Sequence, residues 1–245
     1  MSWTPPRDAT PLRDLPPHVR LLAWPALNRQ GAVPGVSVDV PPELAAAPPS
    51  LACYSGAVGV RFHPPTAPGP APEPEELLTS AESDGPLAEP LRLVGTLAVW
   101  DEVVRAGGVY GGNIYLASEH SVAALLRTAH DAEPPTADRL AELLEQLHAL
   151  ELLYRFPVAY KFRGKHGLER QCRINGWGRL LFRLLDAAPT NPYGLGDARR
   201  RLAEHVHAHR EVYRRGVIAA SAAEDDSGAR IWSDIHAEQP VPVLI

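Results

Sequence analysis

Beyond residue 90, apolar residues recur every three or four positions, which is the spacing of helices with one buried face. The first series predicts a helix over about 91–106. Ser118 begins a second helix that runs to about His130, and Thr136 caps a third that runs to about Tyr154. The apolar stripe of the third helix consists of Leu140, Leu143, Leu144, Leu147, Leu150 and Leu153.

The pattern changes to alternation after the third helix and predicts a β-hairpin that begins at Phe156. A three-residue loop, Lys165-His166-Gly167, gives the two strands one apolar face and one polar face, whereas a two-residue turn mixes the faces. This register places Val158 opposite Ile174. It also places Lys161, Arg163, Gln171 and Arg173 on the outer face.

Asn175 is positioned to cap a fourth helix, in which Arg179 and Arg183 share an exposed side. The residues expected to be buried in this helix are Trp177, Leu180, Leu181, Leu184 and Leu185. A long last helix is predicted from Gly196 to Ala222. A short strand, Asn113–Leu116, is predicted before the second helix.

The first 90 residues contain 19 of the 26 prolines, and no long helix fits such a sequence because proline interrupts helices. The alternation over Val36–Val40 predicts a strand, and Leu51–Phe62 predicts one or two more. Pro64–Pro74 is typical of an extended linker, and Glu73–Pro90 is acidic and mobile by composition. We expect an irregular arm that either packs on the rest of the chain or stays partly loose.

These patterns predict a mostly helical α+β protein with four regions. They are a Pro-rich N-terminal arm with short strands (1–62), a Pro-rich and acidic linker (63–90), a domain of helices and a hairpin (91–187), and a C-terminal helix and tail (188–245).

Charge is distributed unevenly along the chain. The whole protein has a formal net charge of −5, but residues 154–183 contain eight basic side chains and one acidic side chain. A local patch of this sign attracts polyanions, since salt screens each charge beyond about 8–10 Å. The predicted hairpin is therefore a candidate contact surface for phosphates or for an acidic protein.

The order of helix, short strand, helix, helix, two-stranded wing and helix resembles the winged helix-turn-helix superfamily. The segment that carries the likeness is Leu153-Tyr154-Arg155-Phe156, then the hairpin, then Ile174-Asn175-Gly176-Trp177-Gly178-Arg179-Leu180-Leu181. The resemblance covers about residues 91–187 and implies a DNA-binding protein, either a transcriptional regulator or a nucleoid-type factor. The expected phosphate contacts are Lys161, Arg163, Lys165, His166, Arg170, Arg173, Arg179 and Arg183.

Two features distinguish the chain from a typical sequence-specific DNA-binding protein of this superfamily. The connection between the second and third helices is long and contains Pro134-Pro135, and the third helix exposes more acidic than basic residues. An acidic helix is unfavourable near phosphates, so we expect the wing to be the contact surface and the sequence specificity to be low. The alternative is a non-enzymatic scaffold whose basic wing binds an acidic protein partner.

Other chemistry has little support in the sequence. No nucleophile–base set, paired carboxylates or cofactor loop is recognisable, so we expect neither catalysis nor a cofactor. Cys53 and Cys172 lack zinc spacing, and His205 and His209, although four residues apart, lack a third ligand. No secretory leader or membrane span is evident, which predicts a cytoplasmic protein. The last helix could support a homodimer.

Overall fold

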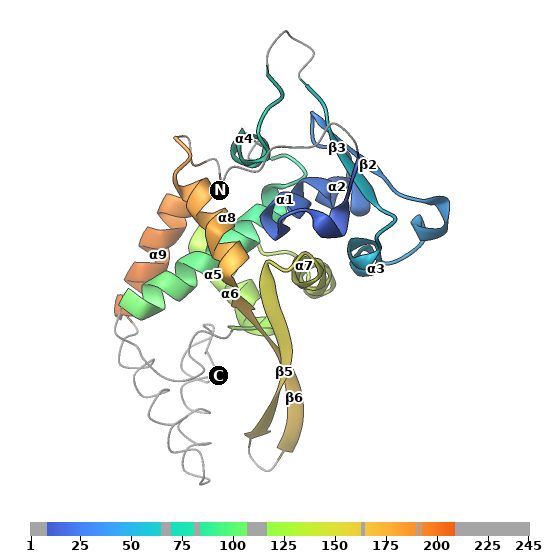
Figure 1. Ribbon diagram of the computed structural model, residues 1–245. Helices are drawn as coiled ribbons and strands as arrows, with labels where there is room; N and C mark the ends of the chain where they lie inside the picture. The colour runs from blue at the N-terminus through green and yellow to red at the C-terminus, as the bar shows by residue number, and fades with distance from the viewer. Residues whose placement is uncertain are drawn as a thin grey trace.

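The computed structural model describes residues 9–64, 70–80, 84–106, 117–162, 165–189, 191 and 193–208, without the side chains of 117–121 and 156–171. The fold is α+β and mostly helical, with two small antiparallel sheets (Figure 1). The described part of the last helix, α9 (Leu195–Ala208), starts as predicted, and its expected continuation to Ala222 lies outside the described residues. The predicted strand Asn113–Leu116 also lies outside them.

The described residues among the first ninety form short elements that pack on the rest of the chain, which is one of the two arrangements expected for the arm. The helices are α1 (Pro17–Arg20), α2 (Trp24–Leu27), α3 (Pro49–Tyr54) and α4 (Pro74–Ser80), with 3-10 turns at Leu12–Asp14, Leu21–Ala23 and Pro42–Leu44. Proline occupies the first turn of each α-helix, where its missing N–H leaves no intrahelical bond unmade. The strands β1 (Thr10–Pro11), β2 (Val36–Asp39) and β3 (Gly59–Phe62) form a sheet in the order β1-β3-β2.

These elements confirm the strand predicted at Val36–Val40, and β3 confirms one strand within Leu51–Phe62, whose first four residues belong to helix α3. One expectation is corrected. The stretch Glu73–Pro90, expected to be mobile, contains α4, whose Leu78 is fully buried, and the start of the next helix. Here an apolar side chain that reaches the core outweighs the local composition.

The second half contains α5 (Ala88–Ala106), β4 (Ala117–Ser118), α6 (Glu119–His130), α7 (Ala137–Ala149), β5 (Leu153–Phe162), β6 (Lys165–Ile174) and α8 (Gly176–Asp186). The strands form a sheet in the order β4-β6-β5. The expected caps are confirmed, because the side chains of Thr136 and Asn175 accept bonds from the N–H groups of Arg139 and Gly178.

One apolar core joins the two halves. Leu12, Leu15 and Trp24 from the N-terminal elements are at most 1% exposed and belong to the same buried cluster as the helices of the second half. Helix α3 packs against α7, and α1 packs against α8. The described part of residues 9–64 is thus an integral part of the core.

The hairpin register differs from the prediction. Helix α7 ends at Ala149 rather than near Tyr154, so β5 starts earlier and Ile174 pairs with Leu153 instead of Val158. The two strands are joined by residues 163 and 164, and not by a loop at Lys165-His166-Gly167. Leu153 and Ile174 are both at most 2% exposed, and their burial at the root of the hairpin fixes the register.

Helix α8 buries Leu181 and Leu185 as expected, but its buried face is shifted away from Trp177 and Leu180. Its buried residues are Gly178, Leu181, Phe182 and Leu185, whereas Trp177 and Leu180 are 43% and 36% exposed. A Cβ atom on Gly178 would lie 2.3 Å from both the carbonyl oxygen of Leu152 and a methyl group of Ile174. The missing side chain lets the helix rest directly on the backbone of the neighbouring turn, and this contact sets the rotation of α8.

We predict that Gly178→Ala destabilises the protein by about 2–3 kcal/mol, because the new methyl group meets a backbone atom that cannot rotate away. Gly176→Ala is the matched control: it lies two residues earlier, and a Cβ atom there meets nothing within 4 Å. The control gains helix propensity and is stabilised by up to about 1 kcal/mol. Urea unfolding measures both, and equal stability of the two variants would contradict the close contact.

Candidate nucleic-acid interface

The hairpin β5–β6 extends away from the helices, with its root in the core (Figure 1). Each strand has 10 residues, so the hairpin is about 33 Å long at 3.3 Å per residue. Among the described strands, β4 pairs with β6 only at Cys172 and Gln171, and β5 forms the outer edge. The hairpin therefore presents an elongated basic segment away from the rest of the fold.

The predicted contact residues are spread over this hairpin and α8. By backbone register Lys161 lies opposite His166, Lys165 opposite Phe162, and Arg170 opposite Pro157. Arg163 falls outside the described residues. Positions 161, 166 and 170 fall on the side of the sheet that buries Cys172 and Ile174 at the root, and positions 165 and 173 fall on the other. The single polar face expected from the sequence is therefore wrong.

A basic residue at the root of the hairpin is used inside the fold. The side chain of Arg155 is 6% exposed and forms an ion pair with Glu145 of α7. The pairing explains how a guanidinium fits on the core side of β5, because a charge removed from water needs an opposite charge and hydrogen bonds.

Arg179, predicted as a phosphate contact, binds a buried carboxylate. Its Nε donates to Oδ2 of Asp101 at 3.1 Å, and a terminal nitrogen lies 3.0 Å from the same oxygen. The Asp101 side chain on α5 is 5% exposed and also pairs with Arg105 one turn away. Arg183, the next predicted contact on α8, is exposed.

We predict that Arg179→Ala lowers the free energy of unfolding by about 1–3 kcal/mol, because it removes one cation from a buried carboxylate. Arg183→Ala, one helical turn away, is the control and changes the unfolding free energy by less than about 0.5 kcal/mol. Chemical denaturation of both variants is the measurement. An unchanged stability of the Arg179 variant would show that Asp101 does not depend on this partner.

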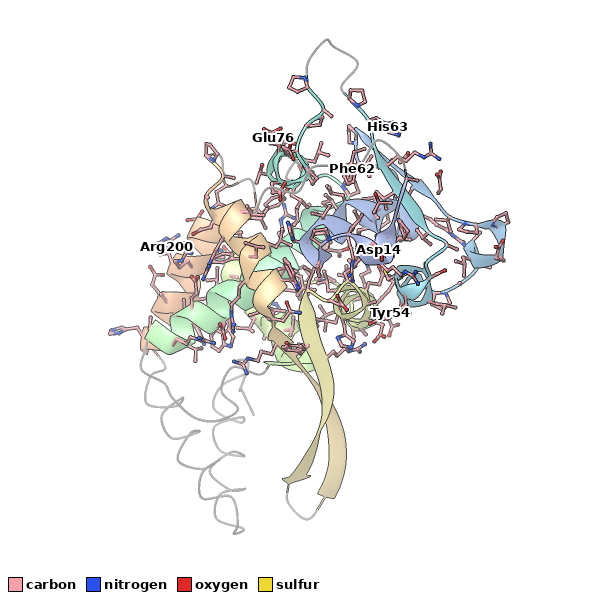
Figure 2. The ribbon with its side chains drawn as sticks, viewed as in Figure 1. Asp14, Tyr54, Phe62, His63, Glu76 and Arg200 are labelled. Carbon is pink, nitrogen blue, oxygen red and sulfur yellow. The ribbon has the colours of Figure 1, made fainter. Side chains whose placement is uncertain are left out.

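Helix α7, which would be the base-reading helix of a winged helix-turn-helix, presents acidic groups. Glu142 pairs with Arg139, and Glu151, just after the helix, pairs with Arg20 from the N-terminal segment. Helix α3 lies against α7, and Figure 2 shows the labelled Tyr54 of α3 beside it. Because α7 is acidic and partly covered, this geometry favours the hairpin over α7 as a surface for polyanions.

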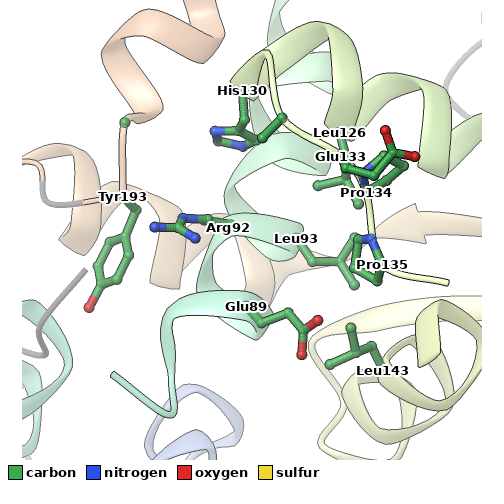
Figure 3. A pocket seen from close by; sticks show the side chains of 12 residues that line it. Glu89, Arg92, Leu93, Leu126, His130, Glu133, Pro134, Pro135, Leu143 and Tyr193 are labelled. Atoms are coloured by element: carbon green, nitrogen blue, oxygen red, sulfur yellow. The ribbon is translucent and has the colours of Figure 1, made fainter. Parts of the chain in front are cut away.

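A cleft of about 610 Å³ lies between α5, the end of α6, the α6–α7 loop, α7 and the residues just before α9 (Figure 3). Its polar lining includes Glu89, Arg92, His130 and Glu133, and its apolar lining includes Leu93. Glu89 forms an ion pair with Arg139, and Glu133 forms one with Arg127. Sequence reasoning missed this cleft because its residues come from separate helices and form no local motif.

His130 in this cleft is held as a neutral ring. The hydroxyl of Thr96 donates to the carbonyl of Arg92 at 2.7 Å and so accepts a bond from Nε2 of His130 at 2.8 Å. Burial lowers the pKa of His130, and the positive charges of Arg92 and Arg201 lower it further. The folded state therefore resists protonation of this side chain.

This lowered pKa predicts a loss of stability in acid. Since the unfolded chain binds the proton near pH 6.5 and the folded chain does so at lower pH, the contribution of His130 is complete above about 6.5 and is lost as pH falls. His130→Gln keeps an N–H donor for Thr96 but does not titrate. We expect the unfolding free energy of the wild type to fall relative to that of this variant between about pH 7.5 and about pH 5.5. Parallel pH profiles in urea unfolding would contradict this role.

No group of three metal-ligating side chains occurs among the described residues, and of the two candidate histidines His205 is described whereas His209 is not. None of the described helices combines the length and apolar character of a bilayer span. Comparison with protein-family models, with curated proteins and with solved structures gives no match.

Proposed function

We propose that this chain is a winged-helix DNA-binding protein, either a transcriptional regulator or a nucleoid-type factor, that contacts phosphates through the hairpin β5–β6. The observation that carries the proposal is the basic hairpin that extends from the helices, with its root in the core. DNA carries one negative charge per about 1.7 Å of its axis, so an elongated basic segment can meet several phosphates at once.

The order of elements supports a winged helix. Helices α5, α6 and α7 and the hairpin after α7 follow one another in the predicted order, and β4 precedes α6 directly after the predicted strand position. The short strand β4 pairs with β6, so the second hairpin strand is central in the sheet. In this proposal β5–β6 is the wing, and α8 closes the domain beside it.

The charge of the wing supports phosphate contact. Residues 154–183 contain eight basic side chains against one acidic residue, Glu169. Two of the eight, Arg155 and Arg179, are bound to carboxylates of α7 and α5. The basic residues that the proposal assigns to phosphates are Lys161, Arg163, Lys165, Arg170, Arg173 and Arg183. Phosphate contact without insertion of α7 into the groove predicts low sequence specificity.

Titration of a labelled random duplex at about 0.05 M and about 0.2 M salt tests this proposal. We expect wild-type binding to weaken steeply with salt. Loss of four wing charges should reduce the slope of log K against log salt by about 3–4, because each phosphate contact contributes about 0.9. The wing variant has Lys161, Arg163, Lys165 and Arg173 changed to alanine.

The matched control removes the same charge from exposed arginines elsewhere. It has Arg29, Arg61, Arg127 and Arg200 changed to alanine, in the N-terminal segment, α6 and α9. We expect this variant to retain most of the affinity and the salt slope. No binding by the wild type at low salt would overturn the DNA proposal, and equal losses in the two variants would overturn the role of the wing.

The second candidate function is a protein-interaction scaffold in which the basic wing binds an acidic partner. The ion pair between Arg155 and Glu145 favours it, because the root of the wing already meets a carboxylate on a helix surface. Under this alternative the wild type fails to bind duplex DNA at low salt. A partner recovered from the native source would then bind the control variant and not the wing variant.

A further inference from the structure

The cleft that contains His130 has the dimensions of a small-molecule site. Its volume of about 610 Å³ lies within the range of about 300–1,000 Å³ that is typical of such sites. Its described lining comes from α5, α6, the α6–α7 loop, α7 and the residues before α9, and it includes no described residue of the hairpin. Any binding in this cleft is therefore separate from the proposed contact between the wing and DNA.

Two nitrogen-bearing side chains meet on one side of the cleft. Arg92 and Thr96 are four residues apart and share a face of α5. The Thr96 hydroxyl accepts a hydrogen bond from Nε2 of His130 at 2.8 Å, which brings the imidazole ring to the turn of α5 that begins at Arg92. Figure 3 shows Arg92 and His130 on the same side of the cleft.

Nδ1 of His130 offers a lone pair to the cleft. The neutral ring has its proton on Nε2, so Nδ1 is an acceptor. A Cβ atom on Gly194 would lie 3.9 Å from Nδ1, so this nitrogen faces the edge of the cleft that Gly194 lines. Within the described part of the chain it has no hydrogen-bond partner.

Arg92 is placed to bind an anion. Its side chain is 40% exposed, and a terminal nitrogen lies 3.8 Å from the carboxylate of Asp84, which is itself 94% exposed. A guanidinium has five N–H donors, so it can bind a second anion beside this distant one. A carboxylate fits best, because its two oxygens match the planar fork of arginine.

The acidic residues of the lining limit the charge of the ligand to one. Glu89 and Glu133 line the cleft and are 41% and 85% exposed, so they repel an ion that carries several negative charges. Each already has an arginine partner, which weakens the attraction of either carboxylate for a cation. The charges therefore favour a monoanion over a phosphate ester or a metal ion.

The opposite wall of the cleft is aliphatic. Leu93, Leu126 and Leu143 line it and are at most 8% exposed. Figure 3 shows Leu93, Pro135 and Leu143 across the cleft from Arg92. Such a wall suits a hydrocarbon chain, for which each buried methylene group strengthens binding about fourfold.

We propose that this cleft binds a small monocarboxylate with an aliphatic body. The carboxylate lies on Arg92 and beside Nδ1 of His130, and the hydrocarbon chain lies against Leu93 and Leu143. This binding site goes beyond the proposed contact with DNA and does not depend on it.

The position of His130 couples this binding to pH. Burial lowers the pKa of His130, and the positive charges of Arg92 and Arg201 lower it further. A bound carboxylate has the opposite effect, because an anion beside the ring favours its charged form. The complex therefore holds the proton to a higher pH than the free protein does, and affinity rises as pH falls. The charged groups around the cleft are Arg92 and Glu89 of α5, Arg139 of α7, Arg201 of α9, and Asp131 and Glu133 after α6.

Ligand-observed NMR on the full chain with sodium hexanoate tests the proposal and measures Kd values into the millimolar range. Two matched probes separate the contributions: hexanamide keeps the chain without the charge, and acetate keeps the charge without the chain. We expect each to bind at least about tenfold more weakly than hexanoate. Absence of hexanoate binding, or equal binding of hexanamide, would overturn the proposal. No DNA is present, so the result is independent of the duplex titration.

Substitution of the two arginines locates the carboxylate. Arg92→Gln should weaken hexanoate binding about 10- to 100-fold, because hydrogen bonds to a charged partner are lost. Arg200→Gln is the matched control, since this arginine is exposed on α9 outside the described lining, and it should keep the wild-type Kd. Urea unfolding verifies that both variants are folded. A wild-type Kd in the Arg92 variant would contradict the site.

The pH dependence tests the contact with His130. We expect the wild type to bind hexanoate about threefold to tenfold more tightly at about pH 5.5 than at about pH 7.5. His130→Gln keeps a donor for Thr96 but does not titrate, so its affinity should stay constant over this interval. A constant affinity of the wild type, or the same pH dependence in the variant, would overturn the proposed position of the carboxylate.

Discussion

The turn between α7 and β5 is the constraint on which the rest of the structure depends. Glu151 adopts the left-handed region with φ of 60°, which costs a non-glycine residue about 1–2 kcal/mol. Three interactions stabilise it: Arg20 binds its side chain, Asn175 binds its carbonyl, and the backbone N–H of Asn175 donates to the carbonyl of Leu152 at 3.4 Å. One turn thus ties the N-terminal segment, the third helix, the hairpin and α8 together.

The position of this turn determines where the hairpin begins and how α8 is rotated. Leu153 enters the strand immediately after the turn, so its pairing with Ile174 is fixed at the root. Gly178 then packs against the carbonyl of Leu152, which buries Leu181 and Phe182 and leaves Trp177 and Leu180 in solvent. The exposed apolar side chains are therefore a consequence of close backbone packing at one corner.

The elements that depend on local signals could be predicted from the sequence. The helix caps Thr136 and Asn175 and the stripe of α7 follow from side-chain chemistry and periodicity over a few residues. The hairpin register did not follow, because alternation alone permits several pairings and the deciding contact joins Leu153 to Ile174 across the whole hairpin. The buried face of α8 was predicted only in part, with Leu181 and Leu185 correct and Trp177 and Leu180 wrong. Periodicity treats glycine as neutral, whereas here the missing side chain of Gly178 allows the close contact that rotates the helix.

The candidate site was also predicted only in part from the sequence. The sequence located the basic segment, but it did not separate the charges needed inside the fold from those available to a partner. Arg179 was predicted to contact phosphate, and its structural partner Asp101 lies 78 residues away, a separation that no local pattern encodes. Arg155 is a similar case, because its partner Glu145 lies on α7 and the pair forms only once the hairpin root docks.

The N-terminal segment gives a physical reason why the wing, and not α7, would meet a polyanion. Burial of Leu12, Leu15 and Trp24 contributes about 1.5–3 kcal/mol for each side chain, which is large compared with the 5–15 kcal/mol that stabilises a typical domain. The segment therefore stays folded whenever the protein is folded, and α3 stays on α7 with it. Exposure of α7 to the major groove would require part of the core to unfold, whereas the backbone of the hairpin already extends away from the helices (Figure 1).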